Sequence, residues 1–318
     1  KRWSAGGVKV CDAADVQDDA YPVTVKDTSV VVVWNDQRAS IIGVYAQRFN
    51  PAGTAEWTAN GKKIVSAYPA YEPRAAWDEG NGVVVVWTEY NTDSSTYFVA
   101  GQRLAGDGTA LWGGAVSVTG SVPGNQGVPQ IVSNGGGSTI VTWQDTRSGA
   151  ADIYAQNFMP GGARNWGALG NAVCTATNIQ LRQVLAHDGA GGAIISWIDL
   201  RNGTDYDLYA QRMDGAGTAM WTGNGIAVAT GYSNQTVPSI AAAPRGGAII
   251  SWQDGRMGLD RDIYAQYLDL AGTKQWSPAN GLAVCTAADS QLNTATVIAD
   301  PDTVSPKVVV CWEDKRTP

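Results

Sequence analysis

One short pattern recurs six times along this chain and constrains its fold more than any other feature. A run of β-branched residues ends in tryptophan, and an acidic residue follows two positions later. In five of the copies an arginine comes two positions after the acid. The tryptophans are Trp34, Trp87, Trp143, Trp197, Trp252 and Trp312, separated by 53, 56, 54, 55 and 60 residues. Internal repeats of this size are structural units that stack on their neighbours. The chain is therefore predicted to have a repeat architecture.

Each repeat is predicted to contain four short strands. In the fifth repeat they cover 238–243, 248–252, 262–267 and 282–285, with glycine-containing turns between them. Four antiparallel strands in a unit too small to bury its own faces are typical of a β-propeller blade. We predict an all-β fold, a six-bladed β-propeller that forms one domain over 1–318. The blades are expected at 21–67, 72–119, 128–176, 181–230, 237–287, and 293–318 together with 1–12.

The two ends of the chain match different strands of one repeat. The segment from Trp3 to Cys11 resembles the fourth strand at 276–285, whereas the chain ends after a second strand at Trp312. Joined together, these ends lack a third strand, so the sixth blade is expected to be one strand short with an open edge at 308–312. An open edge accepts an added strand. We expect the polypeptide to continue past Pro318 or to begin before Lys1, or a neighbouring chain or flanking domain to complete the blade.

Composition excludes several classes of function. The formal net charge is −7, and nucleic acids and anionic membrane surfaces both favour a basic patch. No apolar run approaches the length of a membrane-spanning helix. We therefore expect no nucleic-acid partner and no membrane insertion. The 25 Trp and Tyr residues, against three Phe, suit rings packed between sheets.

The repeat pattern resembles a known group of proteins. Its tryptophan-acid-arginine strand end, its third strand of the type Asp262-Ile-Tyr-Ala-Gln266, and the turn from Asp214 to Trp221 are similar to tandem repeats of large secreted or surface proteins of bacteria. More distantly, the turn resembles the Asp-box of sialidases, with different spacing. The resemblance implies a propeller in an extracellular or cell-surface setting. It does not by itself imply sialidase chemistry, because fold does not fix function.

The repeated motif residues are interpreted as structural. They are Trp34, Asp36, Arg38, Trp143, Asp145, Arg147, Trp197, Asp199, Arg201, Trp252, Asp254 and Arg256. A guanidinium can bind a substrate carboxylate, but a residue present in every blade gives a site no asymmetry. We expect each aspartate and arginine to form a pair that ties the turn to Asp152, Asp207 or Asp262.

Catalytic and metal-binding patterns are sparse. The chain has a single histidine, which leaves no Ser/His/Asp or Cys/His set, and its four cysteines are expected to be small buried residues without disulfides. Zinc spacing is absent. We predict no cofactor, with calcium as the one alternative. Asp254, Asp260 and Asp262 share one turn and are its weak candidates, because calcium prefers oxygen ligands.

The second repeat departs from the pattern and is the predicted ligand site. It lacks the arginine and carries Glu89, Tyr90, Asn91 and Asp93 around the turn. A ring face offers apolar stacking to a sugar, while carboxylate and amide groups orient its hydroxyls. Drift within a repeat array is the alternative explanation of this difference.

Two classes of function fit these observations. The main prediction is a noncatalytic extracellular propeller, not an enzyme, which serves as a binding, adhesion or assembly module of a larger protein and contacts a protein or glycan at the cell surface. The alternative is a glycan-active, sialidase-like hydrolase, which needs a cleft that gathers nonrepeated carboxylates, with Glu72, Glu79, Glu89 and Asp93 the expected source. A ligand-free scaffold or filament subunit is a third possibility.

Overall fold

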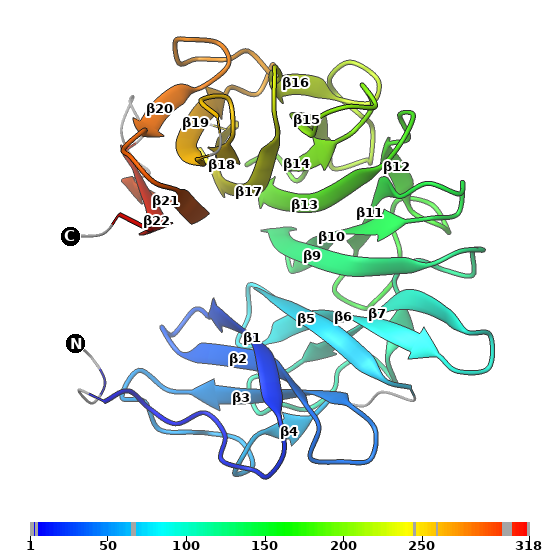
Figure 1. The fold of residues 1–318 in the computed structure, drawn as a ribbon. Helices are drawn as coiled ribbons and strands as arrows, with labels where there is room; N and C mark the ends of the chain where they lie inside the picture. Colours follow the sequence, from blue (N-terminus) through cyan, green and yellow to red (C-terminus); the bar gives the residue numbers. More distant parts are fainter. Residues whose placement is uncertain are drawn as a thin grey trace. The chain divides into compact units, whose positions relative to one another are not determined.

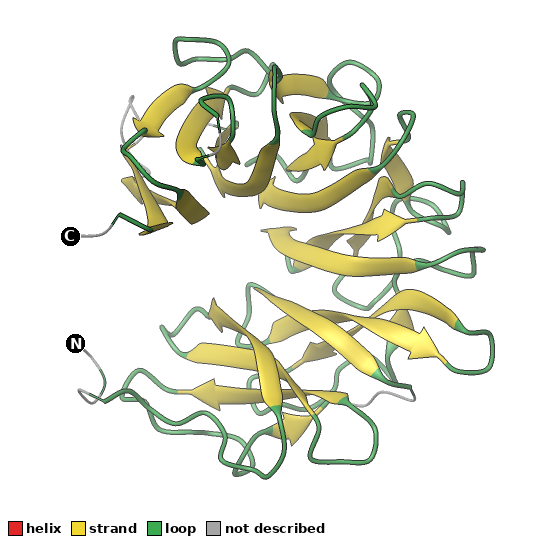
Figure 2. Cartoon of the chain, in the orientation of Figure 1, coloured by secondary structure: helices red, strands yellow, loops and turns green. Residues whose placement is uncertain are grey.

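The computed structural model describes residues 3, 6–64, 68–243, 246–258, 260–300 and 307–316, and within them every regular element is a β-strand. Figure 2 shows strands joined by loops and turns. Within these ranges no helix is long and apolar enough to cross a membrane. Both chain ends named above, Lys1 and Pro318, lie outside the described residues.

The strands form antiparallel sheets in the order of the sequence (Figure 1). The first sheet contains β1 (Gln17–Thr24), β2 (Val30–Asp36), β3 (Gly43–Phe49) and β4 (Lys62–Lys63). The second contains β5 (Ala70–Trp77), β6 (Val83–Asn91), β7 (Thr96–Leu104) and β8 (Val116–Ser117). The third contains β9 (Gln126–Gly135), β10 (Ser138–Asp145), β11 (Asp152–Phe158) and β12 (Asn171–Cys174).

The remaining sheets repeat this plan. The fourth contains β13 (Gln180–His187), β14 (Ala193–Asp199), β15 (Asp207–Met213) and β16 (Ile226–Ala229). The fifth contains β17 (Gln235–Ala242), β18 (Ala248–Asp254), β19 (Asp262–Leu268) and β20 (Leu282–Cys285). The last contains β21 (Gln291–Asp300) and β22 (Lys307–Asp314) and has two strands among the described residues. This is the blade construction of a β-propeller, and it confirms the predicted fold class.

The chain divides into two compact units. The first comprises Lys1–Arg147 and Gln156–Gly170, and the second comprises Ser148–Ala155 and Asn171–Pro318, so the third sheet contributes strands to both. The number of six blades and the single domain stay predictions.

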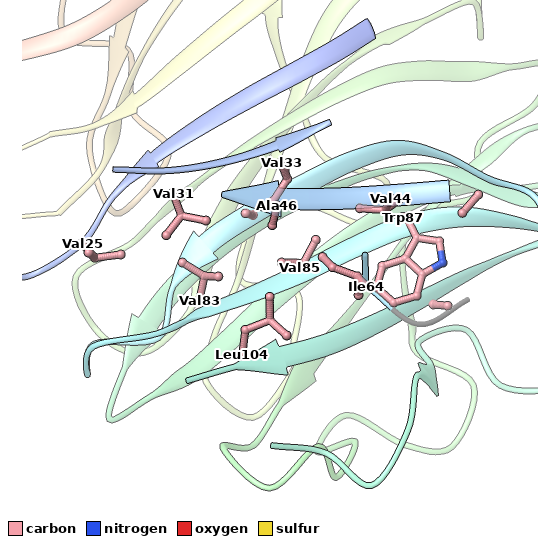
Figure 3. Packing of buried hydrophobic residues seen from close by; sticks show 13 residues of the cluster. Val25, Val31, Val33, Val44, Ala46, Ile64, Val83, Val85, Trp87 and Leu104 are labelled. Carbon is pink, nitrogen blue, oxygen red and sulfur yellow. The ribbon is translucent and has the colours of Figure 1, made fainter. Parts of the chain in front are cut away.

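The second strand of each four-stranded sheet is buried because apolar residues cover both of its faces. In the first unit, valines of β2 and β6 form one cluster that Trp87 joins, and Figure 3 shows their side chains together with Val44, Ile64 and Leu104. Trp87 is fully buried. The repeated run of β-branched residues thus supplies the core between neighbouring sheets.

Each first strand contains a β-bulge near its beginning. The register shifts lie between Asp18 and Tyr21 in β1, between Tyr71 and Arg74 in β5, and at the matching place in the other first strands. One residue per bulge has a positive φ: Asp19, Glu72, Val128, Arg182, Val237 and Asn293. A bulge leaves its extra residue unpaired and bends the strand.

The bulge corrects the predicted start of the first strands. The fifth was expected to begin at Pro238, yet β17 begins at Gln235 and Pro238 follows the bulge residue Val237. Proline has no N–H to give to a ladder, so it fits where the pairing is interrupted. The sequence signal for a strand start was in fact the signal for a bulge.

The N-terminal segment packs on the first sheet in the way that a fourth strand of one blade packs on the next. Trp3 Nε1 donates to the Pro51 carbonyl at 3.1 Å, and Val8, Val10 and Cys11 pack with Trp3 against the cluster around Trp34. The same bond joins Trp57 to Gly106 at 2.9 Å, Trp112 to Pro160 at 3.0 Å and Trp221 to Leu270 at 3.1 Å. Trp3 thus makes the same contact as the repeated tryptophans to which it was matched. Completion of the last sheet by this segment or by another chain stays a prediction.

Candidate functional site

In four sheets the repeated tryptophan, aspartate and arginine form one hydrogen-bonded group at the end of the second strand, which is β2, β10, β14 or β18. In the fourth sheet, Trp197 Nε1 donates to Asp199 Oδ2 at 2.8 Å. Arg201 donates hydrogen bonds to the same carboxylate from Nε at 2.9 Å and from Nη2 at 2.6 Å. Asp36, Asp145 and Asp254 are held by the same donors in their sheets. Burial opposes the charge of Asp36, but the hydrogen bonds from Arg38 and Trp34 hold its pKa below the ordinary value.

The guanidinium group of each of these arginines is thus bound by the aspartate of its own motif. Arg201 also donates to the Asn224 carbonyl at 2.8 Å and lies 3.7 Å from the centroid of the Tyr209 ring. The expected tie to Asp207 is wrong in this sheet, because Asp207 accepts from Asn202 Nδ2 at 3.0 Å and from the Gly231 amide at 3.3 Å. Asp199, two residues before Arg201, is closer to it in the sequence than Asp207 is, and its carboxylate fits the guanidinium fork.

In the second sheet Glu89 takes the place of the repeated aspartate. Trp87 Nε1 donates to Glu89 Oε2 at 2.8 Å, and Glu89 is only 3% exposed. The four predicted ligand residues are therefore split. Glu89 is buried, whereas Tyr90, Asn91 and Asp93 lie towards the tip of the β6–β7 hairpin. Tyr90 pairs with Tyr97 across this hairpin. Their role as ligand contacts stays a prediction.

Aromatic and polar groups gather around the same hairpin. The rings of Tyr90 and Tyr97 lie 4.8 Å apart, and Tyr71 lies 6.5 Å from Tyr97. The Tyr68 hydroxyl donates to Asp93 Oδ2 at 3.1 Å. A cavity of about 590 Å³ beside the hairpin is lined by Asn91, Tyr97 and nine further residues of the first unit.

Nonrepeated charged residues also occur at the bulges of the first strands. In β1, both oxygens of Asp19 accept from Arg74 Nη1 of β5 at 3.2 Å. In β5, Glu72 Oε2 accepts from the Thr88 hydroxyl at 2.9 Å and from the Val128 amide of β9 at 3.1 Å. Figure 1 shows β1, β5 and β9 in the first unit, where β5 contacts both of the others. The bulges thus place two carboxylates and a guanidinium on neighbouring strands.

The four carboxylates expected to share one cleft do not gather. Glu79 follows β5 at the opposite end of the β5–β6 hairpin from Glu72, and its Oε2 accepts from the Gly137 amide at 3.1 Å. Glu89 is buried under its tryptophan, and Asp93 lies in the β6–β7 turn. Of these four, only Glu72 lies at a bulge, and sequence reasoning missed the bulge residue Asp19 and its partner Arg74.

A simple alignment would have found the bulge positions. Five of the first strands begin with a glutamine, at Gln17, Gln126, Gln180, Gln235 and Gln291, and the positive-φ residue comes two positions later. In the second sheet Ala70 takes the place of the glutamine. Because the bulge residues differ in chemistry from sheet to sheet, this column of the repeat carries the asymmetry that the tryptophan motif lacks.

The calcium candidates belong to the structural group or to its surroundings. Asp254 is bound by Trp252 and Arg256, and Asp260 is exposed. The pKa of Asp262 is raised by burial and by the nearby charges of Asp254 and Asp260. Across the described part of the chain, no group of three His, Cys, Asp or Glu side chains is arranged to hold a metal ion. Calcium binding stays untested.

Comparisons of sequence identified no relatives. No family model matches the chain. A search of curated proteins likewise gave no match.

Solved structures with a similar fold include several glycoside hydrolases. The GH93 α-L-arabinofuranosidase of Fusarium graminearum, solved with arabinobiose, is 13% identical with a TM-score of 0.54 and covers 93% of this chain and 90% of its own. The α-L-arabinanase of Penicillium chrysogenum, also solved with arabinobiose, is 14% identical with a TM-score of 0.50 and covers 93% of both chains. A protein of unknown function from Dyadobacter fermentans is 10% identical with a TM-score of 0.55 and covers 96% of this chain and 92% of its own.

These comparisons define the fold class of the chain and correct the functional prediction. At these identities the likeness establishes a shared propeller fold. The prediction of a noncatalytic module that is not an enzyme is contradicted, because the neighbours of known activity are glycoside hydrolases. The prediction rested on the uniformity of the repeats, which left no asymmetric site. The bulge positions differ from sheet to sheet and supply that asymmetry. The finer resemblance to bacterial surface repeats is not supported by a family match.

Proposed function

We propose that this protein is a glycan-active glycoside hydrolase whose reacting groups lie at the bulges of β1 and β5. The observation that carries the proposal is the pair of nonrepeated carboxylates at these bulges, Asp19 of β1 and Glu72 of β5, with Arg74 of β5 bound to Asp19. A functional site on a repeat fold needs residues that differ between the repeats, and the bulge position provides one such residue in each repeat. The fold-level likeness to an α-L-arabinofuranosidase and an α-L-arabinanase agrees with this class of reaction.

Hydrolysis of a glycosidic bond uses two carboxyl groups on either side of the bond. One protonates the leaving oxygen, and the other attacks the sugar or activates water. Glu72 is held in one orientation by two neutral donors, Thr88 and the Val128 amide. Asp19 is held by the Arg74 guanidinium, and both of its oxygens are engaged by one nitrogen. Fixed carboxylates meet the positional demand of catalysis.

Arg74 is assigned a positioning role. Its Nη1 also donates to the Pro73 carbonyl at 2.8 Å, and its guanidinium carbon lies 5.3 Å from the centroid of the Tyr21 ring. These contacts fix the guanidinium between β1 and β5. A guanidinium fork held in this way orients the carboxylate that it contacts.

The competing explanation for Glu72 is that it only ties β5 to β9. Glu79 offers a matched control, since its Oε2 also accepts a backbone N–H of the third sheet at 3.1 Å, from Gly137. We therefore compare Glu72→Gln and Asp19→Asn with Glu79→Gln. Release of reducing sugar is measured on a panel of neutral and acidic plant and bacterial polysaccharides, beginning with arabinan.

The proposal expects both bulge variants to lose at least about a hundredfold in turnover at an unchanged melting temperature, with Glu79→Gln as active as the unaltered chain. Equal activity in all three variants would refute the assignment of these carboxylates. Absence of turnover in the unaltered chain on every polysaccharide of the panel would refute the hydrolase itself.

Two further expectations accompany this function. Paired carboxyl groups need no cofactor for hydrolysis, so dialysis against EDTA should leave turnover unchanged. We also propose an extracellular or cell-surface setting, which the composition and the repeat resemblance support. Fractionation of the source cells tests this point directly.

A further inference from the structure

The β6–β7 hairpin is longer than the matching hairpins of other sheets. Both strands have nine residues, whereas β14, β15, β18 and β19 have seven each. The additional pairs are Tyr90 with Tyr97 and Asn91 with Thr96. The second sheet therefore projects a short ladder beyond the point at which the others end.

This projection is held rigidly. The Tyr97 amide donates to Asn125 Oδ1 of the loop before β9 at 3.0 Å. The Tyr97 ring is 40% exposed although it packs on Tyr90 and Tyr71. An exposed ring supported on one side by other rings presents its remaining surface in a fixed orientation, which reduces the entropy lost on binding.

The adjoining cavity combines this ring with polar groups. Its volume is about 590 Å³, and its lining includes the Asn91 amide, several serine and threonine hydroxyls and the Arg164 guanidinium. Among the described residues that line it, none is Asp or Glu. Although the whole chain carries a net charge of −7, a cationic group in a pocket lined by no described carboxylate favours an anionic ligand there.

Arg164 is specific to this sheet. In the isolated bridges that follow each third strand, its place is taken by Ala55, Ala110, Ala219 and Lys274. Its Nη1 donates to the Ser117 carbonyl at 3.1 Å, which directs the side chain along the cavity wall. The remaining guanidinium N–H groups are suited to the two oxygens of a carboxylate.

We propose that this cavity is a binding subsite for a uronic acid residue of a glycan. The sugar carboxylate contacts Arg164, an apolar face of the ring stacks on Tyr97, and the hydroxyls are bound by Asn91 and the neighbouring side-chain hydroxyls. The cavity lining contains neither Asp19 nor Glu72. The inference is therefore independent of the proposed hydrolase.

The test is a calorimetric titration of the full chain with trigalacturonate at low salt. The same oligosaccharide with methyl-esterified carboxyl groups serves as the neutral probe. Binding is measured on the unaltered chain and on Glu72→Gln, so that the result does not depend on hydrolysis. We expect the acidic probe to bind at least tenfold more tightly than the neutral one, and its affinity to fall as salt is added.

Three variants assign the contacts. Arg164→Ala places the residue of three sister sheets at this position, so the fold should tolerate it, and it should abolish the preference for the acidic probe. Tyr97→Ala should weaken both probes about tenfold or more. Lys274→Ala is the matched control and should bind like the unaltered chain.

Equal affinity for the two probes, an unchanged preference in Arg164→Ala, or no binding of either probe would each overturn the proposal. If inorganic sulfate competes as well as trigalacturonate does, the cavity is a general anion site and the uronate assignment is wrong. Loss of binding with full turnover in Arg164→Ala, together with loss of turnover and full binding in Glu72→Gln, would support a subsite that is separate from the proposed active site.

Discussion

Replacement of Arg201 by alanine tests how burial determines the strength of the repeated ion pair. The change removes two charge-assisted bonds to Asp199, whose side chain is fully buried, and one to the Asn224 carbonyl. Asp199 would keep the Trp197 indole and a backbone amide as donors. Breaking a buried pair from one side costs about 3–5 kcal/mol. Because Arg201 itself is 21% exposed, we expect a loss of roughly 3 kcal/mol.

The last sheet supplies the internal comparison. Arg316 binds Asp314 with the same geometry, but the two side chains are 52% and 26% exposed. Solvent screens an exposed pair, so Arg316→Ala should lower stability much less than Arg201→Ala. Arg201→Lys keeps the charge but not the fork, and its loss should be intermediate.

Urea titration followed by tryptophan fluorescence measures these differences, and calorimetry should show Arg201→Ala melting roughly 4–5 °C lower. Equal losses in Arg201→Ala and Arg316→Ala would refute the argument from burial. A loss of turnover in Arg201→Ala at unchanged stability would refute the structural reading of the whole motif.

Three further predictions follow from other residues. Burial, with the charges of Asp205 and Asp199, raises the pKa of Asp207 above its unfolded value. The folded state therefore has its full stability below the unfolded pKa of this carboxyl, and it loses stability as the pH rises through the folded pKa and Asp207 ionises. Asp207→Asn should therefore raise the melting temperature at pH 7 but not at pH 3, and a lower value at pH 7 would contradict this. Gly108 has φ +78°, and a Cβ there would lie 3.1 Å from Trp57. Gly108→Val should cost about 1–3 kcal/mol in urea titrations, and unchanged stability would contradict the close packing. Burial raises the pKa of the Cys174 thiol to about 12, so iodoacetamide at pH 8 should modify exposed Cys311 and spare Cys174, as peptide mass mapping would reveal.

The sequence predicted the fold because its strongest signals report packing. Trp34 and its counterparts mark second strands buried on both faces, and the spacing between them leaves room for three more short strands. Each of these inferences rests on a residue that the core or a neighbouring sheet requires in every repeat.

The candidate site was harder to predict because its residues obey no repeated rule. A bulge adds one residue to a strand, so Pro238 looked like a strand start although the strand begins at Gln235. The same shift hid Asp19 and Glu72 as equivalent positions. Glu89 was the opposite error, since its place after the tryptophan identified it as the motif acid, and the structure holds it there.

The bulges also determine how such a protein can change. The positive-φ residue of each first strand lies outside the pairing ladder, so its side chain can be exchanged without breaking a ladder hydrogen bond. Among the described strands this position already holds Asp19, Glu72 and Arg182 in some sheets and valine in others. Valine is unfavourable at positive φ, so Val128 and Val237 are positions where asparagine or aspartate would be accommodated with less strain. New charged groups could thus be introduced or removed one sheet at a time while the tryptophan-based core stays the same.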